Sequence, residues 1–421
     1  MTPRLPLPVW AAMRFLQFPA RPEETVAAAQ LHLSEWKRLL DFADLTQLTL
    51  VLRARLVETG AWDQIPDDIR RRLDQNLADN TERWQRTQAA LAEIADRFAA
   101  AGVDFLVLKG LSHSSPFVAN PRHRVQYDID FFFPGDAVYL ARDILLDMGY
   151  EALAGYDDFP IDHLPTMLRK SGWRWRGNFF DPEIPPAVDL HFRLWDPRTE
   201  QLEAPGIEHF WNRRVEQRLA ERRLWQFDLA DQMGYATLHA LRHLLRGSLR
   251  VYHIYELAFF LENRKADGEF WTRWRNLHPP ALRRLESTAL RLAEHWFGTS
   301  AAPAFGPAHP VPEEVERWTA CYGWSPVEAL FRPNKHELFL HLSLLDGSAN
   351  RWSVLRRRLA PFSLPAPVDV VQAPKEQITL RLRALKWIRY FAFLGSRLVH
   401  HTRVLLPTLW GLARWQAGSR Q

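Results

Sequence analysis

Hydrophobic residues recur at helical spacing through the first hundred residues of the chain. Apolar positions within residues 39–51 follow one another at intervals of three and four, and a longer pattern of this kind covers residues 67–101. Pro66 precedes the longer pattern and Gly102 follows it, which are typical start and stop signals of a helix. We therefore expect residues 1–101 to form a helical N-terminal region.

The pattern changes after Gly102. An apolar run over residues 105–108 ends at Lys109-Gly110, and a second run, YDIDFFF, occupies residues 127–133 and is rich in residues that favour β-strands. The turn Pro134-Gly135-Asp136 leads into a helical pattern over residues 138–148, with Asp136 as the expected N-cap. A returning strand at Tyr150 completes a strand–helix–strand alternation, which predicts a mixed α/β core.

The core is expected to continue to residue 198. Residues 155–172 are polar and irregular, a hairpin is expected over about residues 173–180, and Pro185-Pro186 precedes a further strand, AVDLHFRL, at residues 187–194. Residues 102–198 thus form the predicted α/β core of the chain.

Helical patterns return after residue 199. They cover residues 228–245 and 252–261, so residues 199–300 are predicted to form a helical domain. Residues 299–312 contain four prolines and no charged residue, which indicates a linker to a helical C-terminal region, and we place that linker and region at residues 301–421. The segment 381–415 is rich in Leu, Trp, Phe and Arg. We expect it to be a helix packed on the domain, and an interfacial membrane helix is the alternative.

Composition narrows the class of protein. The 421 residues are enough for two or three domains, and the net charge of +5 is mildly basic, which suits a phosphate-rich substrate without the dense positive field of a dedicated nucleic-acid binder. A single cysteine, Cys321, excludes an intramolecular disulfide and any zinc site built from several cysteines. No signal-peptide pattern and no apolar run long enough to span a bilayer is evident, so we expect a cytoplasmic protein.

Asp128 and Asp130 carry the clearest chemistry. On a strand, residues two apart point to the same face, and two carboxylates among aromatic residues repel each other and resist desolvation. A divalent cation relieves both costs, and carboxylates suit Mg²⁺. The alternative is a pair of structural aspartates on a turn or in an ion pair.

The order of several short motifs resembles a known family. Leu108-Lys109-Gly110 is followed by Arg124 four residues before Asp128-Ile129-Asp130, then by Asp189-Leu190-His191, and then by residues His239, His243 and Glu256. Over about residues 30–265 the chain resembles the uncharacterised nucleotidyltransferase family of bacterial proteins, within the polymerase β-like superfamily. The resemblance implies an α+β fold in which a small mixed sheet is flanked by helices. It also implies Mg²⁺-dependent (or Mn²⁺-dependent) transfer of an NMP from an NTP substrate.

The resemblance implies roles for individual residues. Asp128, Asp130 and Asp189 are the expected catalytic and metal-binding carboxylates. The expected nucleotide-binding residues are Lys109, Gly110, Ser112, Arg124 and His191. The further residues implied for the site are His239, His243 and Glu256. Related enzymes have a Gly-Ser pair at the phosphate loop, whereas Leu111 separates Gly110 from Ser112 in this chain.

Some of these residues have a purely structural alternative role. Lys109 or Arg124 can instead be ion-pair partners of the aspartates. The pair His239 and His243, at i and i+4 on one helix face, is more often a core or surface pair than a metal site.

The acceptor stays open between a peptide, a small molecule and RNA. A non-catalytic nucleotide-binding protein that keeps the fold and a phosphotransferase are the rival functions. Neither a Walker A motif nor GxGxxG occurs, which gives P-loop and Rossmann functions no support.

Overall fold

The computed structural model describes residues 5–21, 23, 31–113, 116–153, 162–169, 171–304, 311–359 and 380–418. Its N-terminal part is helical, as the hydrophobic pattern predicts. The helices are α1 (Leu7–Phe15), α3 (Leu33–Thr46), α4 (Thr49–Glu58) and α5 (Asp67–Ala100). α5 starts directly after Pro66 and is followed by Gly102 at φ +68°, so the expected helix is confirmed at both ends.

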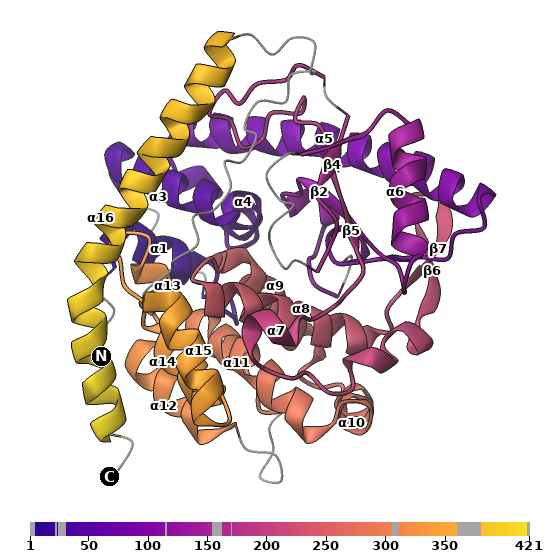
Figure 1. The fold of residues 1–421 in the computed structure, drawn as a ribbon. Coiled ribbons are helices and arrows are strands. Elements are labelled where there is room, and N and C mark those ends of the chain that lie inside the picture. The colour runs from indigo at the N-terminus through magenta and orange to yellow at the C-terminus, as the bar shows by residue number, and fades with distance from the viewer. Residues whose placement is uncertain are drawn as a thin grey trace.

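A five-stranded mixed sheet forms the centre of the α/β core (Figure 1). Its strands are β1 (Leu106–Val107), β2 (Asp128–Phe132), β3 (Glu151–Ala152), β4 (Met167–Leu168) and β5 (Ala187–His191), in the spatial order β1-β2-β5-β4-β3. The pair β2–β5 is parallel, while β1–β2, β4–β5 and β3–β4 are antiparallel. The parallel pair places Asp130 directly opposite Asp189.

The two faces of the sheet differ because side chains alternate along each strand. Ile129, Phe131 and Phe133 from β2 and its end pack with Val188 and Leu190 from β5 in one hydrophobic cluster. α5 and α6 (Ala137–Asp147) cover this face, through the following residues: Leu91, Ile94, Phe98, Val138, Ala141 and Leu145. The intervening positions, Asp128, Asp130, Asp189 and His191, therefore lie on the opposite face.

α6 and β3 confirm the expected strand–helix–strand alternation after β2. Asp136 precedes α6 as expected, but its side chain makes no capping hydrogen bond, so the prediction of a side-chain N-cap was wrong. Asp136 has helical backbone angles, whereas a capping side chain needs the extended conformation that an N-cap residue usually adopts.

A helical bundle packs against the site-bearing side of the sheet. The short α7 (Pro197–Glu200) leads into it, and its main helices are α8 (Leu229–Arg246), α9 (Val251–Arg264), α10 (Gly268–Leu277) and α11 (Pro280–Phe297). α12 (Glu313–Tyr322), α13 (Ser325–Glu328), α14 (Glu337–Leu344) and α15 (Ser348–Leu359) extend it, with α12 against α11 and α14 against α8. One continuous hydrophobic cluster includes residues from α1, α3, α8, α9, α11, α12 and α14.

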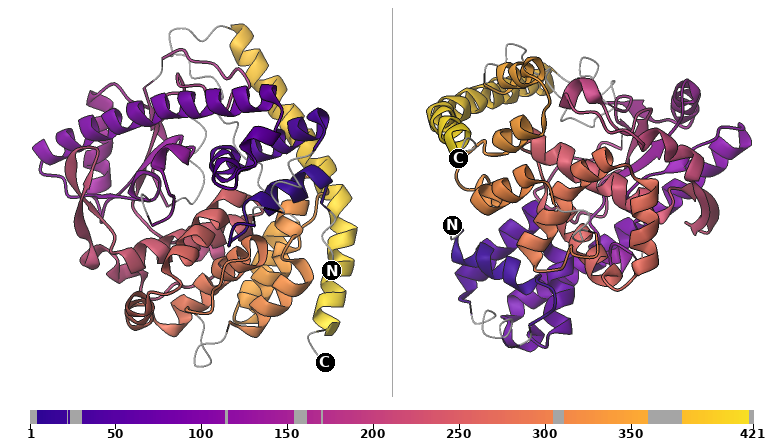
Figure 2. Two further views of the ribbon diagram at one scale, coloured as in Figure 1. Left: turned by 180° about the vertical axis from the view of Figure 1, so that it is seen from behind. Right: turned by 90° about the horizontal axis from the view of Figure 1, so that it is seen from below.

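The C-terminal segment forms one long helix, α16 (Leu380–Gly418). Figure 1 and the two views of Figure 2 show it along the outside of the molecule, with its C-terminal part beside α12 and α14. The expectation of a helix in this segment is confirmed. Among the described residues, no helix combines the length and the apolarity needed to cross a bilayer.

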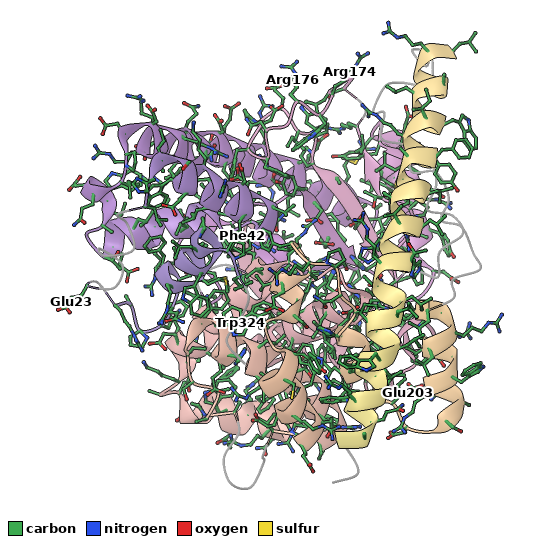
Figure 3. All side chains as sticks on the ribbon, turned by 90° about the vertical axis from the view of Figure 1, so that its left-hand side faces the viewer. Glu23, Phe42, Arg174, Arg176, Glu203 and Trp324 are labelled. Carbon is green, nitrogen blue, oxygen red and sulfur yellow. The ribbon has the colours of Figure 1, made fainter. Side chains whose placement is uncertain are left out.

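The hairpin expected over residues 173–180 is absent. No strand occurs within residues 173–180; instead, the side chains of Arg83 and Tyr127 donate hydrogen bonds of 2.7 Å and 2.9 Å to the carbonyl oxygen of Phe179. Bonds to neighbouring side chains thus hold this segment in place of a strand ladder. Arg174 and Arg176 point outward from it (Figure 3).

The hairpin lies further along the chain, where only helices were expected. β6 (Val215–Leu219) and β7 (Arg222–Gln226) are antiparallel and are joined by Ala220 and Glu221, which both have positive φ. Buried Leu219 and Leu224 alternate with polar residues, so the pattern is that of a half-buried ribbon. A third difference is β4, a short strand within residues 155–172, which were expected to be irregular.

The α+β fold class, a small mixed sheet flanked by helices between helical N- and C-terminal regions, is confirmed. The division into four regions stays a prediction. Part of the predicted linker lies outside the described residues, and the described Ala301 and Ala304 are buried in the large cluster.

Candidate active site

The parallel register of β2 and β5 brings the expected carboxylates to one cavity. Asp128 and Asp189 line a cavity of about 230 Å³, together with Lys109, Arg124 and His191. Asp130, opposite Asp189 on the neighbouring strand, is buried behind it. Asp189, which is distant along the sequence, thus meets Asp128 and Asp130 on one face of the sheet.

Asp130 is held by two cationic partners. Its Oδ1 atom lies 3.1 Å from Lys109 Nζ and 3.0 Å from His191 Nε2, while its Oδ2 atom is buried without a hydrogen-bond partner. Burial by itself raises the pKa of Asp130, but Lys109 and His191 outweigh it and hold that pKa well below its usual range. Asp130 is therefore ionised, and one of its oxygens is free for a further cation.

Asp128 experiences the opposite environment. Burial, followed by repulsion from Asp130, raises the pKa of Asp128 to about 6, and Lys109 and Arg124 only partly offset this. The ionised form of Asp128 is consequently disfavoured by its surroundings until another positive charge arrives.

Asp189 completes a group of possible metal ligands. Its Oδ1 atom accepts a hydrogen bond of 2.6 Å from Thr166 Oγ1, and His163 Nδ1 lies 3.9 Å from the same atom. Ligand atoms of Asp130, Asp189 and His191 lie within 4.8 Å of one another. Asp128 lines the same cavity but stands outside that group, and His191 stands in it.

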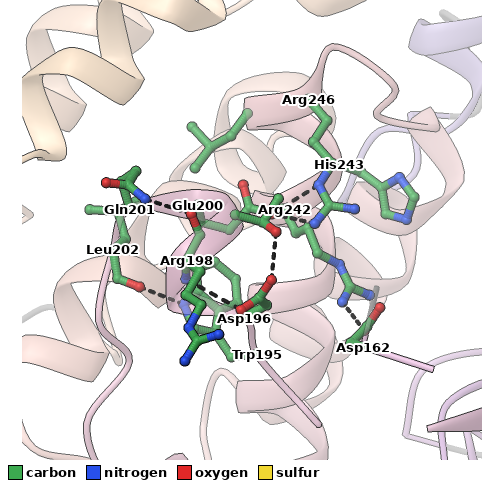
Figure 4. A network of polar contacts seen from close by, with 12 residues as sticks. Asp162, Trp195, Asp196, Arg198, Glu200, Gln201, Leu202, Arg242, His243 and Arg246 are labelled. Atoms are coloured by element: carbon green, nitrogen blue, oxygen red, sulfur yellow. Dashed lines mark hydrogen bonds and ion pairs between the residues drawn. The ribbon is translucent and has the colours of Figure 1, made fainter. Parts of the chain in front are cut away.

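A chain of charged contacts extends behind His191. His191 Nδ1 lies 3.5 Å from Asp162, and Asp162 also pairs with Arg242 from α8. Figure 4 shows Arg242 directed at Asp162, while Arg246, one turn later, is directed at Glu200. Burial opposes protonation of His191, but its bonds to Asp130 and Asp162 outweigh this and raise its pKa to about 9. His191 is thus an imidazolium at neutral pH that holds two carboxylates in place.

Three histidines lie on the other side of Lys109. His239 Nε2 is 3.3 Å from Lys109 Nζ and 3.2 Å from His243 Nε2, and the ring of His253 from α9 packs 4.7 Å from that of His239. Burial lowers the pKa of all three histidines well below its usual value, and nearby cations lower it further. His239 thus contacts the ammonium group of Lys109 as a neutral ring, and His243 and His253 pack against His239.

Arg124 and Glu256 form a separate pair. Arg124 Nε donates to Glu256 Oε1 at 2.8 Å, and His113 Nδ1 lies 3.7 Å from the same oxygen. Burial raises the pKa of Glu256, but Arg124 and His113 outweigh this and lower it. Glu256 therefore fixes Arg124 at the wall of the cavity.

The loop after β1 departs from the cavity. Gly110 has φ +55°, and a Cβ atom there would lie 2.4 Å from Gln126 Nε2, so both the backbone angle and the close approach require glycine. Gly110 lines a neighbouring cavity of about 520 Å³ that shares Arg124. Ser112 is buried and its hydroxyl donates to the Lys109 carbonyl oxygen at 3.2 Å, so it supports the loop.

Comparison with known proteins identifies the family to which this chain is related. A family model described as uncharacterised nucleotidyltransferase matches residues 32–298. The chain belongs to this family. Its matched region begins before α3, ends after α11 and contains every carboxylate of the site, while α12–α16 lie outside it. No curated protein and no solved structure matches the chain.

Sequence reasoning missed part of the site that this family member contains. Asp162 lies in a stretch without hydrophobic periodicity, and His163 and Thr166 follow it in the same stretch. No sequence pattern therefore identifies these three residues as part of the site. Arg242 stands between the two expected histidines on α8, and that position was the one available signal. His253 follows on α9, three residues before the expected Glu256.

Proposed function

We propose that the protein is a Mg²⁺-dependent nucleotidyltransferase that moves an NMP from an NTP to an acceptor. The observation that supports this most is the convergence of Asp128, Asp130 and Asp189 on one face of two adjacent strands, with Lys109 between them and α8. Membership of the nucleotidyltransferase family supports the same reaction class.

The carboxylates fit a divalent cation. Asp130 and Asp189, with Asp128 beside them, offer an oxygen-rich donor set, and the buried Oδ2 atom of Asp130 has no partner within the described chain. When bound, the cation neutralises phosphate oxygens and stabilises the charge that develops during transfer.

Other residues of the chain hold the substrates. Lys109 and Arg124 provide positive charge at the cavity for triphosphate oxygens, and Arg124 has the planar group for bidentate binding. His191 orients Asp130. An acceptor oxygen forms the new bond to the α-phosphorus, its proton passes to a site carboxylate, and the bond to the bridging oxygen breaks so that pyrophosphate leaves.

Labelled nucleotides test the reaction directly. The protein is incubated with Mg²⁺ and each NTP labelled at the α-phosphate, together with candidate peptides, small molecules and RNA. We expect the label to appear in an acceptor with the wild type and with Asp147→Asn on the exposed face of α6, and to be absent with Asp189→Asn. Label from no NTP in any acceptor, with no Mg²⁺-dependent stabilisation by NTP, would argue against the function.

The rival functions give different results in the same experiment. A phosphotransferase labels the acceptor from an NTP labelled at the γ-phosphate instead of the α-phosphate. A non-catalytic binding protein gains stability from Mg²⁺ and NTP, by about 2.7 kcal/mol at a hundred times Kd, but labels nothing.

A further inference from the structure

A second, strongly basic pocket adjoins the candidate active site. It encloses about 480 Å³ and lies among the end of α8, the turn before α9, α15 and α16. Six cationic side chains line it: Arg246, Arg250, Lys335, Arg357, Arg358 and Arg397. Arg246 and Arg250 also line the cavity that holds the carboxylates, so the two spaces share a wall.

The positive charge of this basic pocket exceeds its negative charge. Glu337, which pairs with Arg358, is the one carboxylate among its lining residues, and Glu200 pairs with Arg246 from outside at 2.8 Å. Within the described part of the chain, the remaining arginines of the pocket, Arg250, Arg357 and Arg397, form no ion pair. Among the described residues, the pocket therefore holds three cations that have no ion-pair partner.

Burial and the surrounding positive charge disfavour the protonated form of Lys335. It is only 8% exposed, and its Nζ atom donates to the Arg358 carbonyl oxygen at 2.7 Å and lies 2.9 Å from His401 Nδ1. Burial, followed by repulsion from Arg358, lowers the pKa of Lys335 to about 8. An anion in the pocket would relieve this repulsion.

We propose that the basic pocket binds a phosphate group of the acceptor. Five of its six cations are arginines, whose planar groups match phosphate oxygens in pairs. Through the shared wall at Arg246 and Arg250, an acceptor held here extends toward the carboxylates. This proposal rests on the nucleotidyl transfer proposed above, and it favours a phosphate-bearing acceptor, RNA or a phosphorylated small molecule, over an uncharged peptide.

Two double variants with the same change of charge test the pocket. Arg357→Ser with Arg397→Ser removes two cations that line the pocket. The control, Arg356→Ser with Arg389→Ser, removes two arginines of the same helices, α15 and α16, that do not line it. Binding of a fluorescent oligoribonucleotide of about ten nucleotides, of inorganic phosphate and of polyglutamate is measured in EDTA. If the acceptor is RNA, we expect the pocket variant to bind the oligoribonucleotide about tenfold more weakly. If the acceptor is a small molecule, we expect this loss for inorganic phosphate alone. The control should change less than about twofold.

Stabilisation by Mg²⁺ and NTP separates this proposal from the function itself. It should be the same in both double variants, because neither changes the carboxylate cavity. Equal phosphate binding by the two variants overturns the proposal, as does tighter binding of polyglutamate than of either phosphate probe. Loss of NTP stabilisation in the pocket variant also overturns it, since the pocket would then hold the nucleotide. Phosphate binding without any transfer leaves the pocket in place and removes the proposed function.

An independent observation concerns the outer face of α16. Large apolar side chains on this face are exposed: Trp387 by 50%, Ile388 by 65%, Phe391 by 63%, Leu398 by 66% and Trp410 by 63%. Their successive spacings are one, three, seven and twelve residues, so at about 3.6 residues per turn they form one broad stripe that covers about 140° of the helix circumference. We call this stripe the outer stripe of α16.

Among the described residues, only the C-terminal half of α16 packs on the protein, at positions that differ from those of the outer stripe. Val404, Leu412 and Trp415 are buried, and Trp415 contacts Phe339 of α14 and Tyr322 of α12. Figure 3 shows the helix running along the surface, with side chains directed away from the body. The outer stripe is therefore a second apolar face in addition to the packing face.

The charge of α16 indicates what covers the stripe. Residues 380–418 contain seven Lys and Arg residues and neither Asp nor Glu. Two copies of such a helix would repel each other, while an anionic lipid surface offers apolar depth for the stripe and negative charge for its cationic rim. Arg414 stacks over the ring of Trp410 at 3.8 Å, which places a cation at the edge of the stripe.

We infer that α16 lies on an anionic membrane surface with its outer stripe in the interface. The test is sedimentation of the full chain with vesicles of phosphatidylglycerol and phosphatidylcholine, and with vesicles of phosphatidylcholine alone. Replacing Trp387, Ile388 and Phe391 by Ser should abolish sedimentation with the anionic vesicles. The control replaces three exposed apolar residues elsewhere, Leu140, Leu146 and Trp352, by Ser and should leave it unchanged.

Four outcomes decide this inference. Binding to anionic vesicles that weakens between about 0.1 M and about 0.5 M salt supports it. Equal binding by both triple variants, or no binding by the wild type, overturns it. A concentration-dependent dimer that the α16 variant abolishes also overturns it, because a second copy would then cover the stripe.

Discussion

Asp128 and Asp130 are two residues apart on one strand, yet their environments have opposite electrostatic effects. Asp130 has Lys109 and His191 as partners, and its ionised form is stabilised. Asp128 is half-buried beside that carboxylate, and its ionised form is destabilised. Neutralising either aspartate removes a charge from the same face, but the effect on folding differs in sign.

We predict opposite stability changes for Asp128→Asn and Asp130→Asn at pH 7 in EDTA. Asp128→Asn should unfold at the same or a higher urea concentration than the wild type, because it removes a repelled charge. Asp130→Asn should lose about 3 kcal/mol, because it leaves Lys109 and His191 buried without their carboxylate. Urea unfolding followed by tryptophan fluorescence measures both.

Transfer activity gives the second half of this prediction. Both variants should lose transfer, and the double variant should be scarcely worse than either one, because cooperating groups are not additive. If Asp128→Asn unfolds early in EDTA and keeps metal-dependent NTP binding, Asp128 is a structural aspartate and the assignment is wrong.

His278 shows the same physics away from the site. It is fully buried, with Nδ1 2.7 Å from Glu286 and Nε2 3.0 Å from Asp231. Burial lowers its pKa, but the two carboxylates outweigh this and raise it to about 9. Because the pKa is higher in the folded state, His278 contributes stability that is fully present below about pH 6.5 and is lost as the pH rises through about 9.

The prediction is a pH-dependent difference between the wild type and His278→Gln. The difference in unfolding free energy should shrink by about 3 kcal/mol between pH 6 and pH 10, which corresponds to the shift in pKa. Urea unfolding at a series of pH values measures it. His209→Gln, at an exposed histidine, should give no such trend, and a difference for His278→Gln that stays constant over this range would contradict the ion-pair role.

At the scale of elements, the β6–β7 hairpin has an unusual turn. Ala220 and Glu221 have φ +49° and +58°, which matches a two-residue turn that normally contains Asn-Gly. We predict that Ala220→Asn with Glu221→Gly raises the unfolding free energy by about 1 kcal/mol, because both residues adopt positive φ more easily. Thermal melting measures this, and Glu216→Gly within β6 should instead lower the melting temperature. A lower melting temperature for the turn variant would contradict this account of the turn.

A comparison of this hairpin with α5 and α8 shows which elements can be predicted from the sequence. α5 and α8 have long apolar stripes with a Pro or Asp at the start and Gly after the end, so each could be predicted almost to the residue. β6–β7 has no Gly or Asn in its turn and several arginines in its strands, so no local signal marked it. Residues 173–180 alternate like a strand, but their contacts with Arg83 and Tyr127 decide the structure.

The residues of the candidate site that could be predicted are those that belong to short strand motifs. Asp128, Asp130, Asp189 and His191 converge because alternation on two strands fixes their face. The partners of these residues depend on tertiary contacts, so Asp162 and the pairing of Glu256 with Arg124 could not be read from spacing.

At the scale of the molecule, the large hydrophobic cluster joins regions that the sequence divides. Trp296 of α11 packs near Trp324, and α12 and α14 contact α11 and α8. We predict that a chain ending at residue 304 unfolds at a lower urea concentration than the full chain and binds a hydrophobic dye, because it exposes this shared core.

Circular dichroism and dye fluorescence measure the truncated chain. Removal of residues 419–421, beyond the end of α16, serves as the control and should leave the urea midpoint unchanged. A truncated chain that unfolds at the same urea concentration as the full protein would show that residues 301–421 form a separate domain.

The pairing of β2 with β5 also determines when activity can arise during synthesis. Asp130 meets Asp189 only after the second strand has been made, and Lys109 meets His239 only after α8 has been made. Contacts between distant parts of a chain form late in folding because their loops must close first. A growing chain that ends before β5 therefore carries Asp128 and Asp130 without Asp189 and His191. An incomplete product of translation of this length lacks the third carboxylate of the candidate site, whatever part of the sheet it has formed.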